Sequence, residues 1–390
     1  MDSTDHKNNN GQSRREFLRR LSMGVGAAVT LPAFGPSMSM FEARKYYEMW
    51  RDMDELPESE KLGIALVGLG NYSTGQLGPA LRETKLCRLS GVVTGTPAKE
   101  PKWADEYGIP ESNIYNYETF DRIADNPDID IIYIVLPNGM HAEYSIRAAE
   151  AGKHVISEKP MATSVADAQA MVDACRKADR KLSIGYRLNF EPHNEEVMRL
   201  GQKEVFGPVQ QMEGGFSFDI TRTPDVWRLD KELAGGGPLM DVGIYVVQAS
   251  LYTTGELPLS VDARIVTENH EVFDEVEETI YWEMEFPGGA TLNAESSYSE
   301  GAHYFRAEAS DGAFSLGPAF GYGGIQGKSS KGQMDYPQVN QQTLQMDAFA
   351  DCIFNDRKSR VPGEMGIRDM KILMAIYESA ETGRRIQFDW

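Results

Sequence analysis

A chain of 390 residues exceeds the usual length of one domain, about 100–200 residues, so we expect two domains. The formal net charge is −20, from 39 basic and 59 acidic side chains, which argues against nucleic acid and anionic membranes as partners because a negative surface repels phosphate. The three cysteines are widely spaced and the six histidines show no ligand spacing, so neither a disulfide framework nor a metal site is expected.

The first 36 residues carry the pattern of an export signal. Arg14 and Arg15, followed by Phe17 and Leu18, precede a mildly apolar run over residues 21–34, and this order is typical of a twin-arginine signal peptide. The run is too short and glycine-rich for a stable transmembrane helix. We therefore predict a signal peptide over residues 1–36 and an exported, periplasmic protein without stable membrane insertion. A basic arm that stays on the protein is the alternative, and no cleavage site is evident.

An amphipathic arm over residues 37–62 leads to a short apolar strand and a glycine turn. In a strand–turn–helix context, the first glycine permits the tight turn and the second lets backbone approach a pyrophosphate, while the helix start offers free N–H groups. The third position of the pattern is Ser73, which is small but is not glycine. A simple βα turn without a ligand is the alternative. The candidate dinucleotide contacts are Gly68, Leu69, Gly70, Asn71 and Tyr72.

The end of the next strand, over residues 87–93, bears on the choice of cofactor. An NAD-binding unit normally places a carboxylate here to hold the ribose 2′-hydroxyl, and none is present. Hydroxyls from Thr94 and Thr96 with the cation of Lys99 suit a 2′-phosphate instead. We therefore predict NADP, with NAD as the second choice. A solvated surface lysine is the alternative reading of Lys99.

Apolar strands and helices continue to alternate up to residue 187, which predicts a doubly wound parallel sheet and a Rossmann dinucleotide-binding domain over residues 63–187. Ligands bind at the carboxyl ends of the strands in such sheets. His141 opens a helix and can equally have a structural role only. The candidate cofactor contacts at these strand ends are Leu136, Pro137, Asn138, His141, Glu158, Lys159 and Arg187.

The remainder, residues 188–390, changes to long alternating runs with a hairpin signal at Pro287-Gly288-Gly289. These runs predict an α+β domain with one large, open, mostly antiparallel sheet that binds substrate and leaves one face for subunit contact. Residues 318–340 are rich in Gly, Ser and Gln and are predicted to form a long loop. Two helices, over residues 342–354 and 366–381, are expected to close the chain.

Three side chains offer acid–base chemistry between the two halves. Three glycines and Pro238 make a helix start, so Asp241 and Tyr245 fall four residues apart on one helical face. Hydride transfer to nicotinamide needs a group that takes the hydroxyl proton, and Tyr245 can do so if the ammonium of Lys159 stabilises its phenolate. Asp241 can hold a sugar hydroxyl. An ordinary cap and a packed aromatic are the structural alternatives.

Taken together, these motifs resemble the Gfo/Idh/MocA oxidoreductase family. The resemblance covers residue 62 to the C-terminus and rests on the order of the glycine turn, Glu158-Lys159-Pro160 and the glycine-rich helix start before Asp241. It implies that Lys159, Asp241 and Tyr245 are catalytic, that Trp227 and Arg228 lie among the cofactor contacts, and that the protein is a homodimer or homotetramer. Tyrosine at position 245, where many members have histidine, is similar to the glucose–fructose oxidoreductase subgroup, which couples aldose oxidation to ketose reduction with retained NADP.

The sequence thus predicts an exported NADP-dependent oxidoreductase of a pyranose or related sugar. An NAD(P)-dependent glycosidase or a keto-sugar reductase of the same superfamily, and a non-catalytic sugar-binding sensor, stay open as alternatives. The identity of the sugar and the retention or exchange of the cofactor are not determined by any motif in the sequence.

Overall fold

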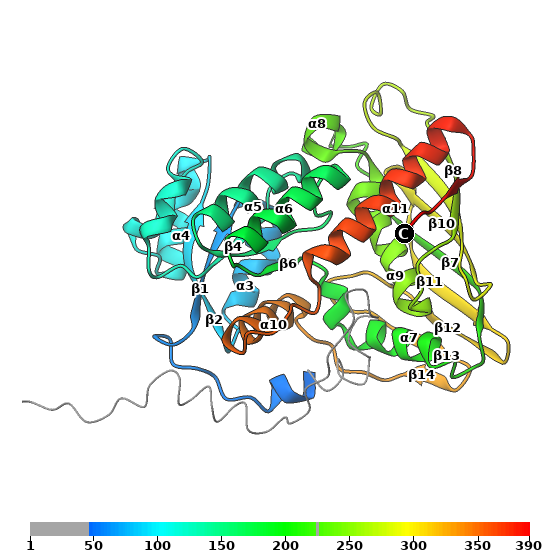
Figure 1. Cartoon of the computed structure of the whole chain (residues 1–390), viewed down its shortest axis with the longest axis horizontal. Helices are drawn as coiled ribbons and strands as arrows, with labels where there is room; N and C mark the ends of the chain where they lie inside the picture. The colour runs from blue at the N-terminus through cyan, green and yellow to red at the C-terminus, as the bar shows by residue number, and fades with distance from the viewer. Residues whose placement is uncertain (1–46, 224–225) are drawn as a thin grey trace, which may run out of the picture.

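The computed structural model describes residues 47–223 and 226–390 (Figure 1). The predicted signal peptide, residues 1–36, lies outside the described residues, as does the first part of the predicted arm. Within the described part, no helix is long and apolar enough to cross a membrane.

The first sheet consists of six parallel strands in the order β3-β2-β1-β4-β5-β6. The chain moves outward from β1 to β3 and then returns to the other side of β1, which is the doubly wound arrangement expected from the sequence. The strands are β1 Leu62–Val67, β2 Cys87–Val93, β3 Ile114–Tyr115, β4 Ile131–Ile134, β5 His154–Ser157 and β6 Leu182–Ile184.

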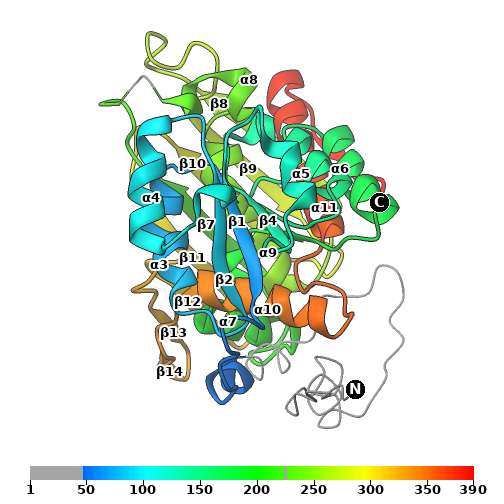
Figure 2. The ribbon, with the colours of Figure 1, turned by 90° about the vertical axis from the view of Figure 1, so that its left-hand side faces the viewer.

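Helices cover both faces of this sheet (Figure 2). All six residues of β1 are buried, and alternate side chains enter different clusters. Ile64 and Leu66 pack in the cluster that contains helix α10, whereas Ala65 and Val67 pack in the cluster that contains α5 and α6. The helices of this domain are α3 Gly78–Leu81, α4 Glu100–Tyr107, α5 His141–Glu150 and α6 Val165–Lys177.

The second sheet has nine strands in the order β14-β13-β12-β11-β7-β10-β9-β8-β15. Its pairs are antiparallel except for β7 with β10, which confirms a large, mostly antiparallel sheet. The strands are β7 Val209–Ser217, β8 Ser260–Val266, β9 Thr279–Glu285, β10 Thr291–Ser297, β11 Ala302–Ala309, β12 Gly312–Leu316, β13 Gly327–Ser329, β14 Gly332–Met334 and β15 Ile386–Gln387.

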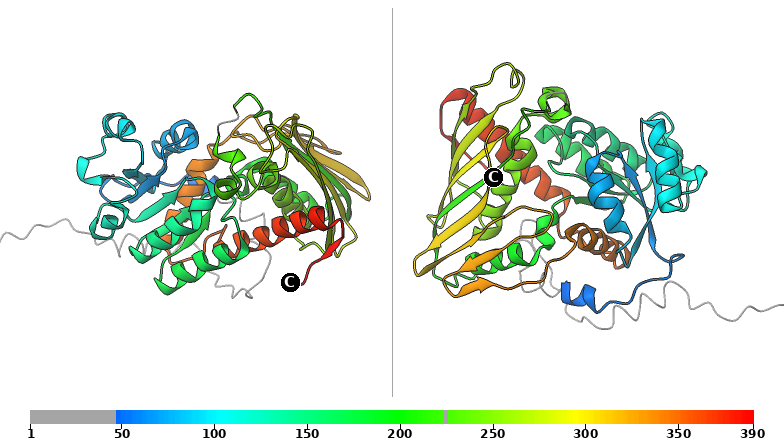
Figure 3. Two further views of the ribbon diagram at one scale, coloured as in Figure 1. Left: turned by 90° about the horizontal axis from the view of Figure 1, so that it is seen from above. Right: turned by 180° about the vertical axis from the view of Figure 1, so that it is seen from behind.

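Among the described residues, helices cover one face of the second sheet. Figure 3 shows these helices on the side that faces the first domain: α7 Pro192–Gln202, α9 Ile244–Thr254 and α11 Gly363–Thr382. Strand β9 illustrates the two faces, because Ile280, Trp282 and Met284 are buried while Glu283 and Glu285 are exposed. This alternation is the signature of a sheet with one polar face.

Of two predictions about the C-terminal part, one is confirmed and one needs correction. The hairpin at Pro287-Gly288-Gly289 is confirmed, since β9 and β10 pair antiparallel across it. The predicted loop over residues 318–340 is wrong in part, because β13 and β14 pair within it and extend the sheet through backbone hydrogen bonds that small and polar residues supply as well as apolar ones. Helix α10 Gln341–Phe354 packs on the first domain, where Thr343 donates to the carbonyl of Ala80.

Candidate active site

The glycine turn has the shape that a pyrophosphate requires. Gly68 adopts φ +96°, and a Cβ there would lie 2.5 Å from the carbonyl oxygen of Val135, so only glycine fits. A Cβ at Gly70 would meet no heavy atom within 4 Å, so this glycine leaves open space beside the turn. Ser73 replaces the third glycine and donates from its buried hydroxyl to the carbonyl of Gly68 at 2.6 Å, which fixes the turn. These features fit a dinucleotide.

Lys99 lies against the same turn. Its ammonium donates to the carbonyl of Leu69 at 2.8 Å, and the hydroxyl of Thr94 accepts from the N–H of Thr96 at 3.1 Å. The cation is therefore held at the edge of the predicted dinucleotide site instead of extending freely into solvent. This position suits the predicted contact with a 2′-phosphate.

The side chains of two predicted cofactor contacts, His141 and Asn138, also contact backbone carbonyls. The side chain of His141 is fully buried, with Nδ1 2.8 Å from the carbonyl oxygen of Pro160 and Nε2 2.8 Å from that of Leu136. Burial lowers the pKa of His141 despite these two hydrogen-bonding contacts. Asn138 donates to the carbonyl of Ala234 at 2.8 Å. Both side chains thus contact backbone carbonyls: His141 links the segments that follow β4 and β5, and Asn138 links the first domain to Ala234 of the second domain.

The structure brings the three predicted catalytic side chains together from both domains. Lys159, directly after β5, donates from Nζ to the backbone carbonyl of Asp241 at 2.6 Å and lies 3.4 Å from Oδ1 of the same residue. The same ammonium lies 4.9 Å from the centre of the Tyr245 ring. The side chains of Lys159 and Asp241 are only 12% and 10% exposed. The cluster is therefore a largely desolvated carboxylate, phenol and ammonium at the carboxyl end of the first sheet.

Asp241 is held by two further side chains. Nε of Arg228 donates to Oδ2 at 2.6 Å, and the hydroxyl of Tyr298 donates to the same oxygen at 3.2 Å. Burial alone would raise the pKa of Asp241, but the charges of Arg228 and Lys159 together with these hydrogen bonds lower it. Asp241 therefore stays ionised. Tyr298, at the end of β10, gave no signal in the sequence because its partner lies 57 residues away.

The charge of Lys159 is also defined by its neighbours. Burial would lower the pKa of its ammonium, but Coulombic attraction to Tyr245, Asp241 and Glu158 outweighs burial and raises it. Lys159 is therefore a permanent cation that can bind an oxygen which gains negative charge.

The helix that presents Asp241 and Tyr245 begins differently from the prediction. Pro238 precedes a π-helical turn, η8 Leu239–Gly243, and α9 begins only at Ile244. Buried Glu277 accepts from the N–H groups of Gly237 at 2.8 Å and Leu239 at 3.2 Å. The carboxylate of Glu277, in the segment just before β9, thus caps the turn. Sequence spacing alone does not reveal this role.

Glu158, which directly follows β5, is buried and does not act as a surface carboxylate. It accepts from the hydroxyl of Tyr133 at 2.6 Å, and that hydroxyl in turn accepts from Gln345 of α10 at 2.8 Å. A Cβ at Gly185 would lie 2.5 Å from the Glu158 carboxylate, so glycine makes room for it. Burial raises the pKa of Glu158.

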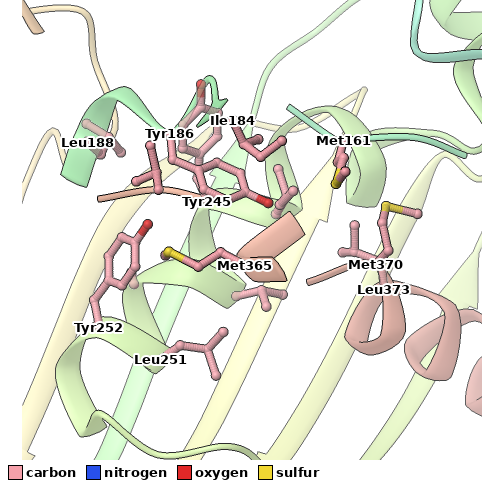
Figure 4. Close-up of a cluster of buried hydrophobic side chains, with 14 of the residues drawn as sticks. Met161, Ile184, Tyr186, Leu188, Tyr245, Leu251, Tyr252, Met365, Met370 and Leu373 are labelled. Carbon is pink, nitrogen blue, oxygen red and sulfur yellow. The ribbon is translucent and has the colours of Figure 1, made fainter. Parts of the chain in front are cut away.

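Arg187, Trp227 and Arg228 were predicted as cofactor contacts. The guanidinium of Arg187 is buried and donates to backbone carbonyls of the β12–β13 loop. Arg228 lies 4.7 Å from the centre of the half-buried Trp227 ring and pairs with Asp241. Tyr245 itself belongs to the large buried cluster, part of which Figure 4 shows with Tyr186, Tyr245 and Met365 labelled.

A doubly wound sheet with a glycine turn, and a lysine, an aspartate and a tyrosine at its carboxyl edge, define the class of nicotinamide-dependent oxidoreductases. Residues 62–186 match the family model described as "Oxidoreductase family, NAD-binding Rossmann fold", and residues 195–314 match the "GFO/IDH/MocA C-terminal domain". The chain belongs to the Gfo/Idh/MocA oxidoreductase family.

The proteins to which the chain is similar include enzymes whose names specify a sugar substrate. The chain is 28% identical to D-xylose 1-dehydrogenase [NADP(+)] of Haloarcula marismortui over 87% of this chain and 97% of that protein. It is 30% identical to D-xylose 1-dehydrogenase (NADP(+)) 2 of Haloferax volcanii over 84% and 99%. The crystal structure of aldose-aldose oxidoreductase from Caulobacter crescentus complexed with glycerol superimposes with a TM-score of 0.82, with 43% identity, over 84% of this chain and 100% of that chain.

Proposed function

We propose that this protein is an NADP-dependent oxidoreductase that transfers hydride between nicotinamide and a carbinol of a pyranose or related sugar. The observation that carries the proposal is the buried contact of the Lys159 ammonium with Asp241, 4.9 Å from the Tyr245 ring, at the edge of a sheet that fits a dinucleotide. Relatives whose names include D-xylose dehydrogenases and an aldose-aldose oxidoreductase support a sugar as substrate.

Each side chain has a distinct role in this proposal. The bound nicotinamide supplies the hydride acceptor. Tyr245 takes the hydroxyl proton of the carbinol, and Lys159 stabilises the oxygen atoms that carry negative charge during the transfer. Asp241, kept ionised by Arg228 and Lys159, accepts a hydrogen bond from a sugar hydroxyl and orients the ring.

We also propose that the cofactor stays bound while one sugar is oxidised and a second is reduced. The 43% identity to an aldose-aldose oxidoreductase over the whole of that chain supports a coupled cycle. The name of that protein favours an aldose as the second substrate. The resemblance stated from the sequence suggests a ketose instead. Gel filtration tests retention: nucleotide should elute with the protein and change its near-ultraviolet absorbance on addition of an aldose and then of a second sugar.

The decisive test of the acid–base role is Tyr245→Phe. Turnover should fall by about 10²–10⁴-fold, the usual contribution of a positioned proton-transfer group. Tyr252→Phe is a matched control, because Tyr252 is a buried phenol on the same helix α9 whose hydroxyl has no hydrogen-bond partner among the described residues. Near-normal turnover of Tyr245→Phe would remove this residue from the mechanism, and cleavage of aryl glycosides would favour the glycosidase alternative.

Export and assembly complete the proposal. Arg14 and Arg15 direct a twin-arginine export pathway, which suits a protein that folds around its cofactor before it crosses the membrane. The face of the second sheet without helices is the proposed contact of a homodimer or homotetramer. Substitution of both arginines by lysine should retain the protein in the cytoplasm, and a double Glu283→Arg, Glu285→Arg variant should elute as a monomer.

A further inference from the structure

Arg187 is a buried cation in an unusual environment. It begins the short helix η6 Arg187–Phe190 at the end of β6 and is only 2% exposed. Nη1 donates to the carbonyl of Gly321 at 2.9 Å and to the side chain of Gln341, and Nη2 donates to the carbonyl of Phe320 at 2.6 Å. Among residues 47–223 and 226–390, no carboxylate forms an ion pair with it, although a buried charge normally requires such a partner.

The surroundings of the guanidinium are phenols. It lies 4.9 Å from the centre of the Tyr245 ring and 4.5 Å from the centre of the Tyr322 ring. Its Nε, which is buried, has no hydrogen-bond partner in the described part of the chain. Lys159 lies at the same distance, 4.9 Å, from the Tyr245 ring. The ring of the proposed acid–base residue therefore lies near two cations, of which Lys159 forms an ion pair with Asp241 and Arg187 senses the more distant charge of Glu158.

The two cations near the Tyr245 ring are held in a buried site. A guanidinium remains protonated throughout the physiological range. Burial would lower the pKa of Arg187, but attraction to the phenols of Tyr245, Tyr72 and Tyr322 raises it. A preorganised cation in a desolvated site stabilises negative charge that forms during a reaction without reorganising at that moment.

We propose that Arg187 is a positioning residue for proton transfer, which acts through Tyr245 by stabilising its phenolate and which is itself held in place by the β12–β13 loop. The inference rests on the proposed role of Tyr245 as acid–base. In the oxidation direction, the carbinol O–H bond breaks and its proton passes to the phenolate oxygen, while the C–H bond of the carbinol carbon breaks and its hydride would be accepted by oxidised nicotinamide when NADP is bound. In the reverse direction, the phenol returns the proton to the carbonyl oxygen.

Other titratable groups lie around Tyr245 and Arg187. The directions of their pKa shifts move their titration away from neutral pH. Burial raises the pKa values of Tyr72 and Tyr322, and burial together with the charge of Arg187 lowers the pKa of His303. These groups therefore change charge away from neutral pH. The titratable and charged groups that face the pair are Lys159 after β5, Glu158 beside it, Asp241 in η8, Tyr72 in the glycine turn, Tyr322 in the β12–β13 loop and His303 on β11.

The test is the pH profile of kcat for carbinol oxidation with the full-length protein and an aldose that the wild type turns over. Loss of the cation should raise the midpoint of the rising limb in Arg187→Met by about one pH unit, and turnover at neutral pH should fall about tenfold. Arg187→Lys keeps the charge but moves it away from the ring, so a smaller upward shift is expected. The near-ultraviolet absorbance of phenolate, corrected with Tyr245→Phe, should report the same midpoint directly.

Arg360→Met is the matched control, because Arg360 is also buried but pairs with Glu195 and lies over the Phe190 ring. It should lose stability without a shift of the midpoint. An unchanged midpoint in Arg187→Met, or in Arg187→Lys where the methionine variant does not fold, overturns the inference even if turnover falls. Normal turnover of Tyr245→Phe would instead overturn the proposed function, so the two failures are distinguishable.

Discussion

Glu277 gives the sharpest test of how the fold supports the site. Its carboxylate is buried, and it accepts the N–H groups of Gly237 and Leu239 at the start of the turn that carries Asp241. The hydroxyl of Tyr377 on α11 donates to it at 2.8 Å. Through hydrogen bonds, this one side chain connects the segment before β9 with the start of the helix and with α11. We predict that Glu277→Ala lowers both stability and turnover.

The magnitude follows from the hydrogen bonds that are lost. A buried N–H group left without an acceptor costs about 1–3 kcal/mol, so two such groups cost about 2–6 kcal/mol of unfolding free energy. The smaller figure applies if water enters the space of the missing carboxylate. Even about 2 kcal/mol is a large part of the 5–15 kcal/mol that stabilises a typical domain. Glu277→Gln keeps one carbonyl acceptor and should lose about half as much.

Urea unfolding monitored by circular dichroism measures the stability, and initial rates with sugar measure turnover. Glu283→Gln is a suitable control, because Glu283 lies on β9, the strand that follows Glu277, but is exposed. It should change the unfolding free energy by less than about 0.5 kcal/mol. If Glu277→Ala unfolds at the same urea concentration as the wild type, the carboxylate is not the acceptor on which the helix start depends, and the reasoning fails.

Three further outcomes are expected. Asp241→Asn should lower kcat/KM by about 10²-fold or more in initial-rate assays, since it removes the anion shared by Lys159 and Arg228. Lys99→Ala should weaken NADP more than NAD in fluorescence titrations, and an unchanged preference contradicts the 2′-phosphate assignment. Burial lowers the pKa of His154 from 6.5 to about 4. The unfolded chain therefore binds a proton that the folded chain does not, and thermal stability should fall as pH decreases from about 6.5 to about 4, with a shallower slope in His154→Gln.

Local patterns determine most of the fold. The strands of the first sheet follow from short apolar runs that end at Gly68, Thr94, Leu136 and Lys159, because parallel strands buried on both faces have few polar positions. Within the largely apolar run over residues 128–136, only Ile131–Ile134 forms β4, since strand pairing and not apolarity sets the ends of the strand. The β13–β14 hairpin was missed because its stability comes from pairing with β12, which composition does not encode.

In the candidate site, too, local patterns locate some features of the residues and tertiary contacts determine others. Lys159, Asp241 and Tyr245 each sit at a recognisable local signal, a strand end or a glycine-rich helix start, and the structure brings them together. His141 also sits at a helix start, yet its ring is enclosed by the carbonyls of Pro160 and Leu136. A local signal therefore locates a residue at the edge of the sheet but does not tell whether its side chain points outward or into the protein.

The residues that sequence reasoning missed share one property: each acts on the site from a distant segment. Tyr298 reaches Asp241 across 57 residues, and the Tyr322 ring lies 4.5 Å from the guanidinium of Arg187, a residue of the other domain. The Tyr298–Asp241 contact forms within the second domain, whereas the contacts of Lys159 with Asp241 and of Arg187 with Tyr322 exist only when the two domains have docked. Since the electrostatic environment of Asp241 and Tyr245 depends on these contacts, the reactive form of the site is a product of domain docking. Variants that loosen the docking, such as Gln345→Ala on α10, should therefore reduce turnover before they reduce secondary structure.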